Sequence, residues 1–326
     1  ASGPRTRPRG DHRGARSRPR TRRRHRQRRD PRVPRAHRAA PHVGTTIIAP
    51  DQAKVAAASR DLSGDEKDAA AYLAAQPTAY WLTPEQDPIG TAGGTVLDLI
   101  SQARDQGAPP RSSSTAFPGA TAATTPRRPV GAGLPRLGRR DRQGARHRPR
   151  GAEDRHPRAR QHRAVGGGGN IGERARQLST AVDGLTTANT WIYIDGGHSN
   201  WLPAEKMADF IRQTGVIDRV RGFATNVSNY QASADEFAYA AALSQLLGGA
   251  HAIVDTSRNG TASSGGEWCN PPGQTVGEPG GTFHDDVVDT NLWIKPPGES
   301  DGTCSGGPAA GVYWPQAGVE LTQGVR

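Results

Sequence analysis

The chain contains 326 residues, of which only 33% are hydrophobic, with 41 Gly and 26 Pro; this composition excludes a core packed along the whole chain. The formal net charge is +12, but residues 1–44 contain 16 Arg and two Asp, and residues 111–168 contain 14 Arg and three acidic residues. The remainder is net acidic, which excludes a uniformly basic surface for nucleic acid. No run of 18 apolar residues occurs, which excludes a membrane-spanning helix.

The amino-terminal segment, residues 1–44, consists mainly of Arg, Pro, Gly, Ala and His. It has almost no apolar surface to bury, so it cannot offset the entropy cost of ordering its backbone. We expect residues 1–44 to be a disordered Arg/Pro-rich segment.

Residues 45–110 have a different composition and an alternating pattern. Helical spacing of apolar residues occurs over 61–76, where Ser63 is a plausible cap, and over 95–107, and a short apolar run at 79–83 predicts a strand between the two helices. The order helix, strand, helix favours an α/β layout. We expect these residues to form the amino-terminal part of a barrel.

Residues 111–169 return to Arg, Gly and Pro and are predicted to be a second disordered segment. After Asn170 the alternation of helices and strands resumes, and residues 170–326 are expected to form the carboxy-terminal part of the barrel with its substrate cleft. Strands that alternate with helices at this spacing indicate a parallel sheet, in which functional residues follow the strands. The predicted helices cover 173–185, 203–215 and 233–248, and the predicted strands cover 190–195, 222–228, 252–257 and 292–296.

Polar and aromatic residues follow several of these strands. Examples are Asp195, His198 and Trp201 after one strand, and Asn226 and Asn229 after the next. Indole rings beside carboxylates and amides suit a sugar-binding cleft, because a pyranose stacks on an indole while its hydroxyls take directed hydrogen bonds. Taken singly, each residue has a structural alternative: a Trp in the core, an Asp that caps the next helix, or a solvated Lys–Glu pair.

Cys269 and Cys304 are the two cysteines of the chain, and an even pair suits an oxidising compartment. Two reduced, buried thiols are the alternative. The amino-terminal residues contain no apolar stretch typical of a signal peptide.

Four strings in chain order, YIDGGHSNW, GFATNVSNY, EWCNPPG and LWIKPPGESDGTC, resemble the successive motifs of glycoside hydrolase family 6, with AYWLTP upstream. The resemblance covers roughly residues 170–326. It implies an inverting cellulase on a distorted (β/α) barrel, which here would be an incomplete α/β fold. It also implies a secreted, monomeric enzyme that acts on cellulose and cello-oligosaccharides and needs no cofactor, metal, nucleic acid or membrane.

The resemblance also implies roles for single residues. Asp301 matches the proposed general base, Asp195 matches a carboxylate that supports the cleft, and Cys269 and Cys304 match a disulfide. The remaining matches fall on substrate-binding positions, which are Trp81, His198, Trp201, Asn229, Trp268, Lys295 and Glu299.

The general acid of the family should follow the helix that ends near Gly107, in a string resembling VVYGIPGRDCG, but the chain reads RSSSTAFPGATAAT. One set of codons for Ser112–Thr124, when it is read in a frame shifted by one base, encodes VVVYGIPGRDCGN. Under a second shift, residues 134–142 and 153–163 regroup to YRAWVDAIA and KIVILEPDSIA. We therefore predict that frame-shifted segments replace two barrel strands and the catalytic acid.

The sequence thus predicts a glucanase by family that is inactive in this form. One alternative is a nucleic-acid-binding protein that uses the Arg-rich segments, although these lack interleaved aromatic residues. Another is a glucan-binding protein without catalytic activity, which the Trp residues would permit.

Overall fold

The computed structural model describes residues 49–51, 53–83, 86–88, 90–106, 115–116, 171–186, 190–262 and 267–326. The predicted disordered segment 1–44 lies outside these residues. The same holds for the segment 111–169 apart from Thr115 and Ala116.

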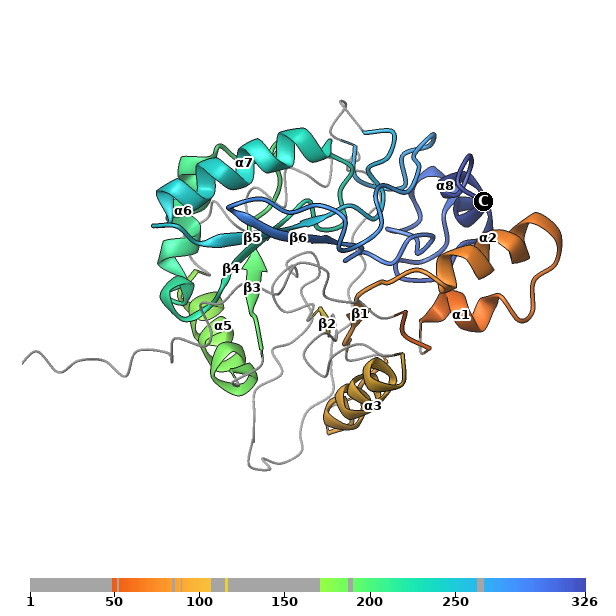
Figure 1. The fold of residues 1–326 in the computed structure, drawn as a ribbon, viewed down its shortest axis with the longest axis horizontal. Coiled ribbons are helices and arrows are strands. Elements are labelled where there is room, and N and C mark those ends of the chain that lie inside the picture. The colour runs from red at the N-terminus through yellow and green to blue at the C-terminus, as the bar shows by residue number, and fades with distance from the viewer. Residues whose placement is uncertain are drawn as a thin grey trace, which may run out of the picture. The chain divides into compact units, whose positions relative to one another are not determined.

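The carboxy-terminal part contains a sheet of four parallel strands in the order β3-β4-β5-β6. Helices and strands alternate along the chain up to β5, which confirms the predicted α/β pattern (Figure 1). The elements are α5 (Ile171–Leu185), β3 (Tyr193–Asp195), α6 (Ala204–Gln213), β4 (Gly222–Thr225), α7 (Ser233–Leu246), β5 (His251–Asp255) and β6 (Val288–Leu292).

The amino-terminal part continues this parallel arrangement. Strand β1 pairs in parallel with β2, and Thr78, just before β1, forms a parallel bridge with Trp293, just after β6. The Ala79 N–H donates to the Trp293 carbonyl at 2.8 Å, so the chain before β1 lies directly beside the end of β6. The elements are α1 (Lys54–Ala58), α2 (Gly64–Ala74), β1 (Tyr80–Trp81), α3 (Ala92–Asp105) and β2 (Thr115–Ala116).

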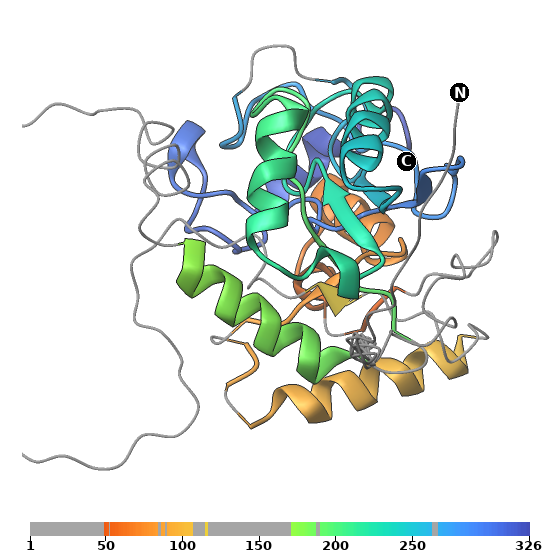
Figure 2. The ribbon, with the colours of Figure 1, turned by 90° about the vertical axis from the view of Figure 1, so that its left-hand side faces the viewer.

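Alternate residues of the strands face two different cores. Ile194, Phe223 and Val254 belong to the larger apolar cluster, which they share with residues of α5, α6 and α7. Ala224 and Ile253 point the other way, into a smaller cluster with Ala79, Val227 and Ile294. Figures 1 and 2 show the three helices on the outer side of the strands. The smaller cluster therefore fills the inner face of a sheet that curves around it, as in a barrel.

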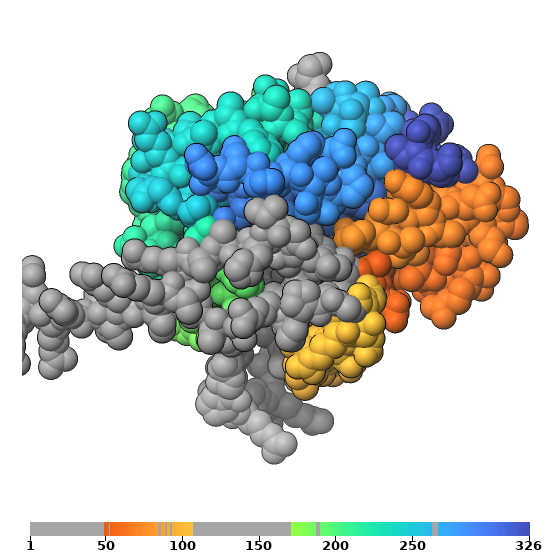
Figure 3. Space-filling model, in the orientation of Figure 1, coloured from red at the N-terminus to blue at the C-terminus, as the bar shows by residue number. Residues whose placement is uncertain are grey.

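A third core joins the two ends of the described chain. Leu73 of α2 packs with Trp293, Tyr313 and Leu321, the last of which belongs to α8 (Pro315–Leu321). Figure 3 shows the surface of α1 and α2 (orange) adjoining the carboxy-terminal residues (dark blue). This core places α1 and α2 beside the loop that follows β6.

Several predicted boundaries were wrong for a physical reason. The strand expected at 292–296 lies earlier, at β6 (Val288–Leu292), because Pro296 and Pro297 have no N–H and the N–H groups of Ile294 and Lys295 donate to the Asp255 carboxylate instead of to a strand. Helices α1 and α8 and strand β2 were not predicted.

The predicted helix at 61–76 corresponds to α2, and Ser63 does precede its first residue, but the Ser63 side chain makes no capping hydrogen bond. The predicted helix at 95–107 corresponds to α3, which ends at Asp105. Gly107, its expected last residue, lies outside the described residues.

The outer edges of β2 and β3 carry no further strand among the described residues. The sheet is therefore not closed within the described part of the chain. This agrees with the expected incomplete barrel.

Candidate active site

The carboxyl ends of the parallel strands bring together loops that are distant in sequence. Strand β3 ends at Asp195 and β5 ends at Asp255, while the loop after β6 carries Lys295, Glu299 and Asp301. Because parallel strands end at the same edge of a sheet, these side chains gather on one side of it.

Asp301 lies at the centre of a buried polar network. Its Oδ2 atom accepts hydrogen bonds from Arg258 Nη1 at 2.8 Å, Tyr230 Oη at 3.0 Å and the Asn270 N–H at 3.2 Å. Lys295 Nζ lies 3.7 Å from its Oδ1 atom. Burial by itself would raise the pKa of Asp301, but Arg258 and then Lys295 outweigh burial and hold the pKa below its usual value. Asp301 is therefore an ionised carboxylate.

Arg258 and Tyr230 complete this network and were not predicted from the sequence. The Arg258 guanidinium is buried, stacks 4.3 Å from the centroid of the Tyr230 ring, and donates through Nη2 to the Ser228 carbonyl at 2.7 Å. Burial raises the pKa of Tyr230 above its usual value, so its hydroxyl keeps the proton that it donates to Asp301. The signal for Arg258 was its place three residues after the end of β5.

Lys295, a predicted substrate-binding residue, is buried beside the same carboxylate. Burial, followed by the positive charge of Arg258, lowers the pKa of Lys295, while Asp301 opposes this shift. Two cations therefore share Asp301. They stabilise its ionised form and reduce its affinity for a proton, which limits how strongly it can act as a base.

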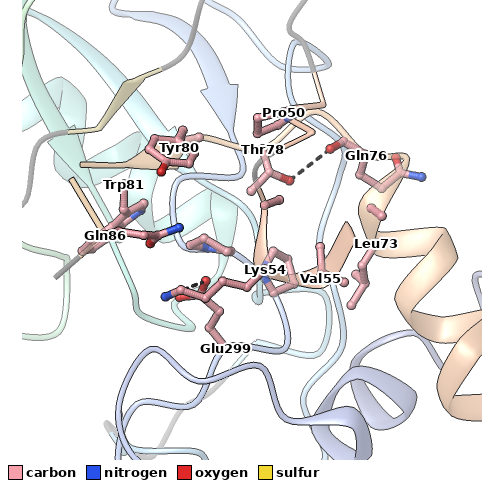
Figure 4. Close-up of a pocket in the computed structure, with 15 residues that line it drawn as sticks. Pro50, Lys54, Val55, Leu73, Gln76, Thr78, Tyr80, Trp81, Gln86 and Glu299 are labelled. Carbon is pink, nitrogen blue, oxygen red and sulfur yellow. Dashed lines mark hydrogen bonds and ion pairs between the residues drawn. The ribbon is translucent and has the colours of Figure 1, made fainter. Parts of the chain in front are cut away.

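A small hollow lies between α1, α2, β1 and the loop that follows β6 (Figure 4). Trp81 lines the hollow and donates from Nε1 to the Ile294 carbonyl at 2.6 Å. Glu299 lines it as well, and its Oε1 atom lies 3.3 Å from Lys54 Nζ. The structure thus pairs Glu299 with Lys54 of α1, a residue that the sequence analysis did not predict.

Asp195 is the last residue of β3, and His198 and Trp201 lie in the loop that follows it. Burial raises the pKa of Asp195 to about 6, against the effect of the hydrogen bond that its Oδ1 atom accepts from the Gly197 N–H at 2.8 Å. The negative charge of Asp255 raises this pKa further. The rings of His198 and Trp201 lie nearly parallel, 6.3 Å apart and inclined by 25°.

Two buried acidic residues support the loops of the site. Asp255 accepts hydrogen bonds from four backbone N–H groups, those of Ser228, Ser257, Ile294 and Lys295, at 3.0–3.2 Å. Glu236, on α7, accepts one from the Ser199 N–H at 2.8 Å. Each carboxylate thereby fixes a loop that carries predicted site residues.

The remaining predicted residues lie on two further loops. Asn229 is half-buried and donates from Nδ2 to the Val227 carbonyl at 2.9 Å. Trp268 is half-buried and precedes Cys269, which forms a disulfide with Cys304 across Cα atoms 6.1 Å apart. The predicted disulfide is therefore present. Asn270, next to it, donates to the Gly302 carbonyl at 2.7 Å and so fastens this loop to Asp301.

Among the described residues, no group of three or more His, Cys, Asp or Glu side chains is arranged to hold a metal ion. Within the same part of the chain, no helix has the length and apolar character needed to cross a membrane.

Comparison with known proteins identifies relatives of the carboxy-terminal part. Residues 169–324 match the profile of "Glycosyl hydrolases family 6". Over 156 residues the chain is 44% identical to Endoglucanase A of Cellulomonas fimi. The aligned segment covers 48% of this chain and 34% of that protein. It is 38% identical over 154 residues to 1,4-beta-D-glucan cellobiohydrolase C of Emericella nidulans, covering 38% of this chain and 34% of that protein.

The matched segments therefore span only about a third of the length of these two relatives.

A solved structure resembles most of the described fold. It is an endoglucanase of Mycobacterium tuberculosis in complex with methyl-cellobiosyl-4-deoxy-4-thio-beta-D-cellobioside, with a TM-score of 0.64, 29% identity, and coverage of 87% of this chain and 98% of that chain.

Proposed function

We propose that the site of this chain is built for the hydrolysis of β-1,4-glucosidic bonds with inversion, because residues 169–324 match glycosyl hydrolases family 6 and the fold resembles that of a solved endoglucanase. The substrates are cellulose and cello-oligosaccharides. The observation that carries the proposal is the ionised Asp301, which is buried in the same loop as Glu299, a residue that lines a hollow with Trp81. The cellobioside bound by the Mycobacterium tuberculosis relative supports the substrate class.

In an inverting reaction, a carboxylic acid protonates the leaving glycosidic oxygen while a carboxylate takes a proton from the water that attacks the anomeric carbon. The two carboxyl groups stand about 6.5–9.5 Å apart to leave room for that water. We assign the base to Asp301 and a supporting role to Asp195. Seven residues bind the glucan, namely Trp81, His198, Trp201, Asn229, Trp268, Lys295 and Glu299.

We further propose that this chain binds glucan without turning it over, because its sequence lacks the general acid. In the regrouped frame the missing Asp corresponds to Thr121, outside the described residues. The pairing of Thr115–Ala116 with β1 supports this, because these two residues correspond to the Tyr and Gly of the regrouped YGIPGRDCG strand. A non-catalytic glucan-binding protein is thus the second candidate, and the intact Trp81 hollow favours it.

The disulfide between Cys269 and Cys304 supports a further part of the proposal, which is that the protein acts in an oxidising compartment after secretion.

The test compares the chain as it stands with a version in which the regrouped reading frame is restored. The present chain should release no measurable reducing ends from cellulose, because general-acid assistance is typically worth roughly 10²- to 10⁴-fold in rate. The restored protein should hydrolyse cello-oligosaccharides, and NMR should show the inverted anomer as the first product.

In the restored protein, Asp301→Asn should abolish most turnover and leave oligosaccharide binding nearly intact, because the amide keeps the shape of the carboxylate but cannot accept the proton of water. Turnover by the unrestored chain would contradict the assignment of the acid. Full activity of the restored Asp301→Asn variant would remove Asp301 from its role.

A further inference from the structure

Lys54, the first residue of α1, reaches into the hollow beside Trp81 from a part of the chain far away in sequence. Its Nζ atom lies 3.3 Å from Glu299 Oε1 and donates to the Gly311 carbonyl at 2.6 Å. Gly311 has φ +79°, and a Cβ atom there would lie 3.4 Å from Lys54 Nζ and 4.0 Å from Glu299 Oε2. The backbone at Gly311 thus lies in contact with this ion pair.

The ammonium of Lys54 has one N–H more than these contacts use. A lysine ammonium carries three N–H donors, and among the described residues Glu299 and Gly311 are the acceptors in contact with it. The Lys54 side chain is 37% exposed, compared with 13% for Glu299. Figure 4 shows the charged ends of Lys54 and Glu299 together at the same side of the hollow as Trp81 and Gln86. The third N–H is therefore available to a molecule in the hollow.

Lys54 also extends the charge network of the site. Charges of opposite sign alternate along Lys54, Glu299, Lys295, Asp301 and Arg258. Lys54 Nζ lies 3.3 Å from Glu299 Oε1, and Asp301 lies 3.7 Å from Lys295 Nζ and 2.8 Å from Arg258 Nη1. Glu299 and Lys54 are both close enough to influence Lys295: Glu299 raises its pKa and Lys54 lowers it. The position of Glu299 within this row depends on the cation on its far side.

The chemistry of the pair selects a neutral polyol. An ammonium donor next to a carboxylate acceptor matches a sugar hydroxyl, which accepts from the one and donates to the other. An anionic ligand such as a phosphate would be repelled by the negative charge of Glu299. The indole of Trp81 in the same hollow offers a face for the apolar side of a pyranose.

We propose that Lys54 is a specificity-determining residue of the glucan site, which orients the Glu299 carboxylate and donates its third N–H to a hydroxyl of a glucosyl unit in the Trp81 hollow. The proposal rests on the proposed function, since it names a further residue of the same site. It adds the amino-terminal helix α1 to a site otherwise built mainly from the carboxy-terminal half.

The test measures binding of cellotetraose to the full chain by calorimetry and by Trp fluorescence, with maltotetraose as the control sugar. Lys54→Met should weaken cellotetraose binding about 10-fold, as expected for the loss of a hydrogen bond from a charged donor. Lys54→Arg should recover part of the affinity, because it keeps the charge and the donors. Lys67→Met is the matched control, because Lys67 is an exposed lysine of the neighbouring helix α2, and it should bind like the wild type.

A double variant separates orientation of Glu299 from a general effect on the fold. If Lys54 acts through Glu299, the loss of affinity from Lys54→Met should be smaller in a Glu299→Gln background than in the wild type. The thermal midpoint of Lys54→Met should stay close to that of Lys67→Met. Equal effects of Lys54→Met in both backgrounds, or a midpoint well below that of Lys67→Met, would overturn the proposal.

The outcomes distinguish this inference from the proposed function. If the wild type binds cellotetraose and Lys54→Met binds it equally well, only the role of Lys54 is overturned. If the wild type binds neither sugar, or binds both equally, the glucan site itself is overturned and the role of Lys54 with it.

Discussion

Two buried Asp–Arg pairs stand at opposite ends of the same strands. At the amino ends, Asp289 of β6 accepts two hydrogen bonds from Arg221, through Nε and Nη2, both at 2.7 Å. It accepts another from Tyr193 Oη at 2.5 Å, and its Oδ1 atom lies 3.1 Å from His251 Nδ1. At the carboxyl ends, Asp301 binds Arg258, Tyr230 and Lys295. Each aspartate thus faces an arginine and a tyrosine.

The residues of the two clusters lie in different kinds of secondary structure. Tyr193, His251 and Asp289 lie within strands, and Arg221 directly precedes one, so the Asp289 cluster connects four neighbouring strands. The members of the Asp301 cluster all lie on loops that follow strands, and Lys295 adds a second cation to that cluster. The same chemistry therefore stabilises the sheet at one end and prepares a charged site at the other.

The largest effect that this comparison predicts is on stability. Asp289→Ala leaves the buried Arg221 guanidinium without its carboxylate, and the free energy of unfolding should fall by about 3–5 kcal/mol. Asp209→Ala is the control, because Asp209 pairs with Arg212 on the exposed surface of α6 and should cost about 1 kcal/mol or less. Chemical denaturation of both variants checks this. Equal losses would show that the Asp289 cluster does not hold the strands together.

The second prediction concerns the loops at the carboxyl ends. The disulfide between Cys269 and Cys304 spans 35 positions and lies next to Asn270, which contacts Asp301. Replacing both cysteines by Ser should lower the free energy of unfolding by about 3–4 kcal/mol in the chain-entropy model. Asp289 and its partners should keep their hydrogen-exchange protection, while the loops around Asp301 lose theirs. Finding two free thiols in protein from an oxidising compartment would contradict the premise.

The sequence predicted the repeated α/β pattern because apolar spacing reports on each element separately. It also predicted that Asp195, Lys295 and Asp301 lie at or after the ends of strands, and the structure does bring Lys295 Nζ within 3.7 Å of Asp301 Oδ1. These features depend on local spacing and on the rule that parallel strands end at one edge.

The sequence could not predict the partners of these residues. Arg258 stacks on Tyr230, and Lys54 binds Glu299 and Gly311, which lie more than 240 residues away along the chain. Such pairs depend on how distant segments meet. The early end of β6 was missed for the same reason, because the acceptor for the N–H groups of Ile294 and Lys295 is Asp255, on another strand.

The smallest effect is a pH dependence that comes from Asp195. Burial raises its pKa from 3.8 to about 6, so the folded state favours the protonated form. This contribution to stability is complete below pH 3.8 and is lost as the pH rises through about 6. Asp195→Asn has no such titration. The free energy of unfolding of the wild type should therefore fall by about 2 kcal/mol relative to the variant between pH 3.8 and pH 7. One pKa unit is worth about 1.4 kcal/mol, and this value is reduced here because Asp195 is half-buried. Denaturation curves of both proteins across this range measure the difference. A difference that stays constant, or that grows in the opposite direction, would show that Asp195 is already ionised at acidic pH, as Asp301 is. The two carboxylates would then share one electrostatic role, whereas the structure separates them into a group with a raised pKa at the end of β3 and a group with a lowered pKa after β6.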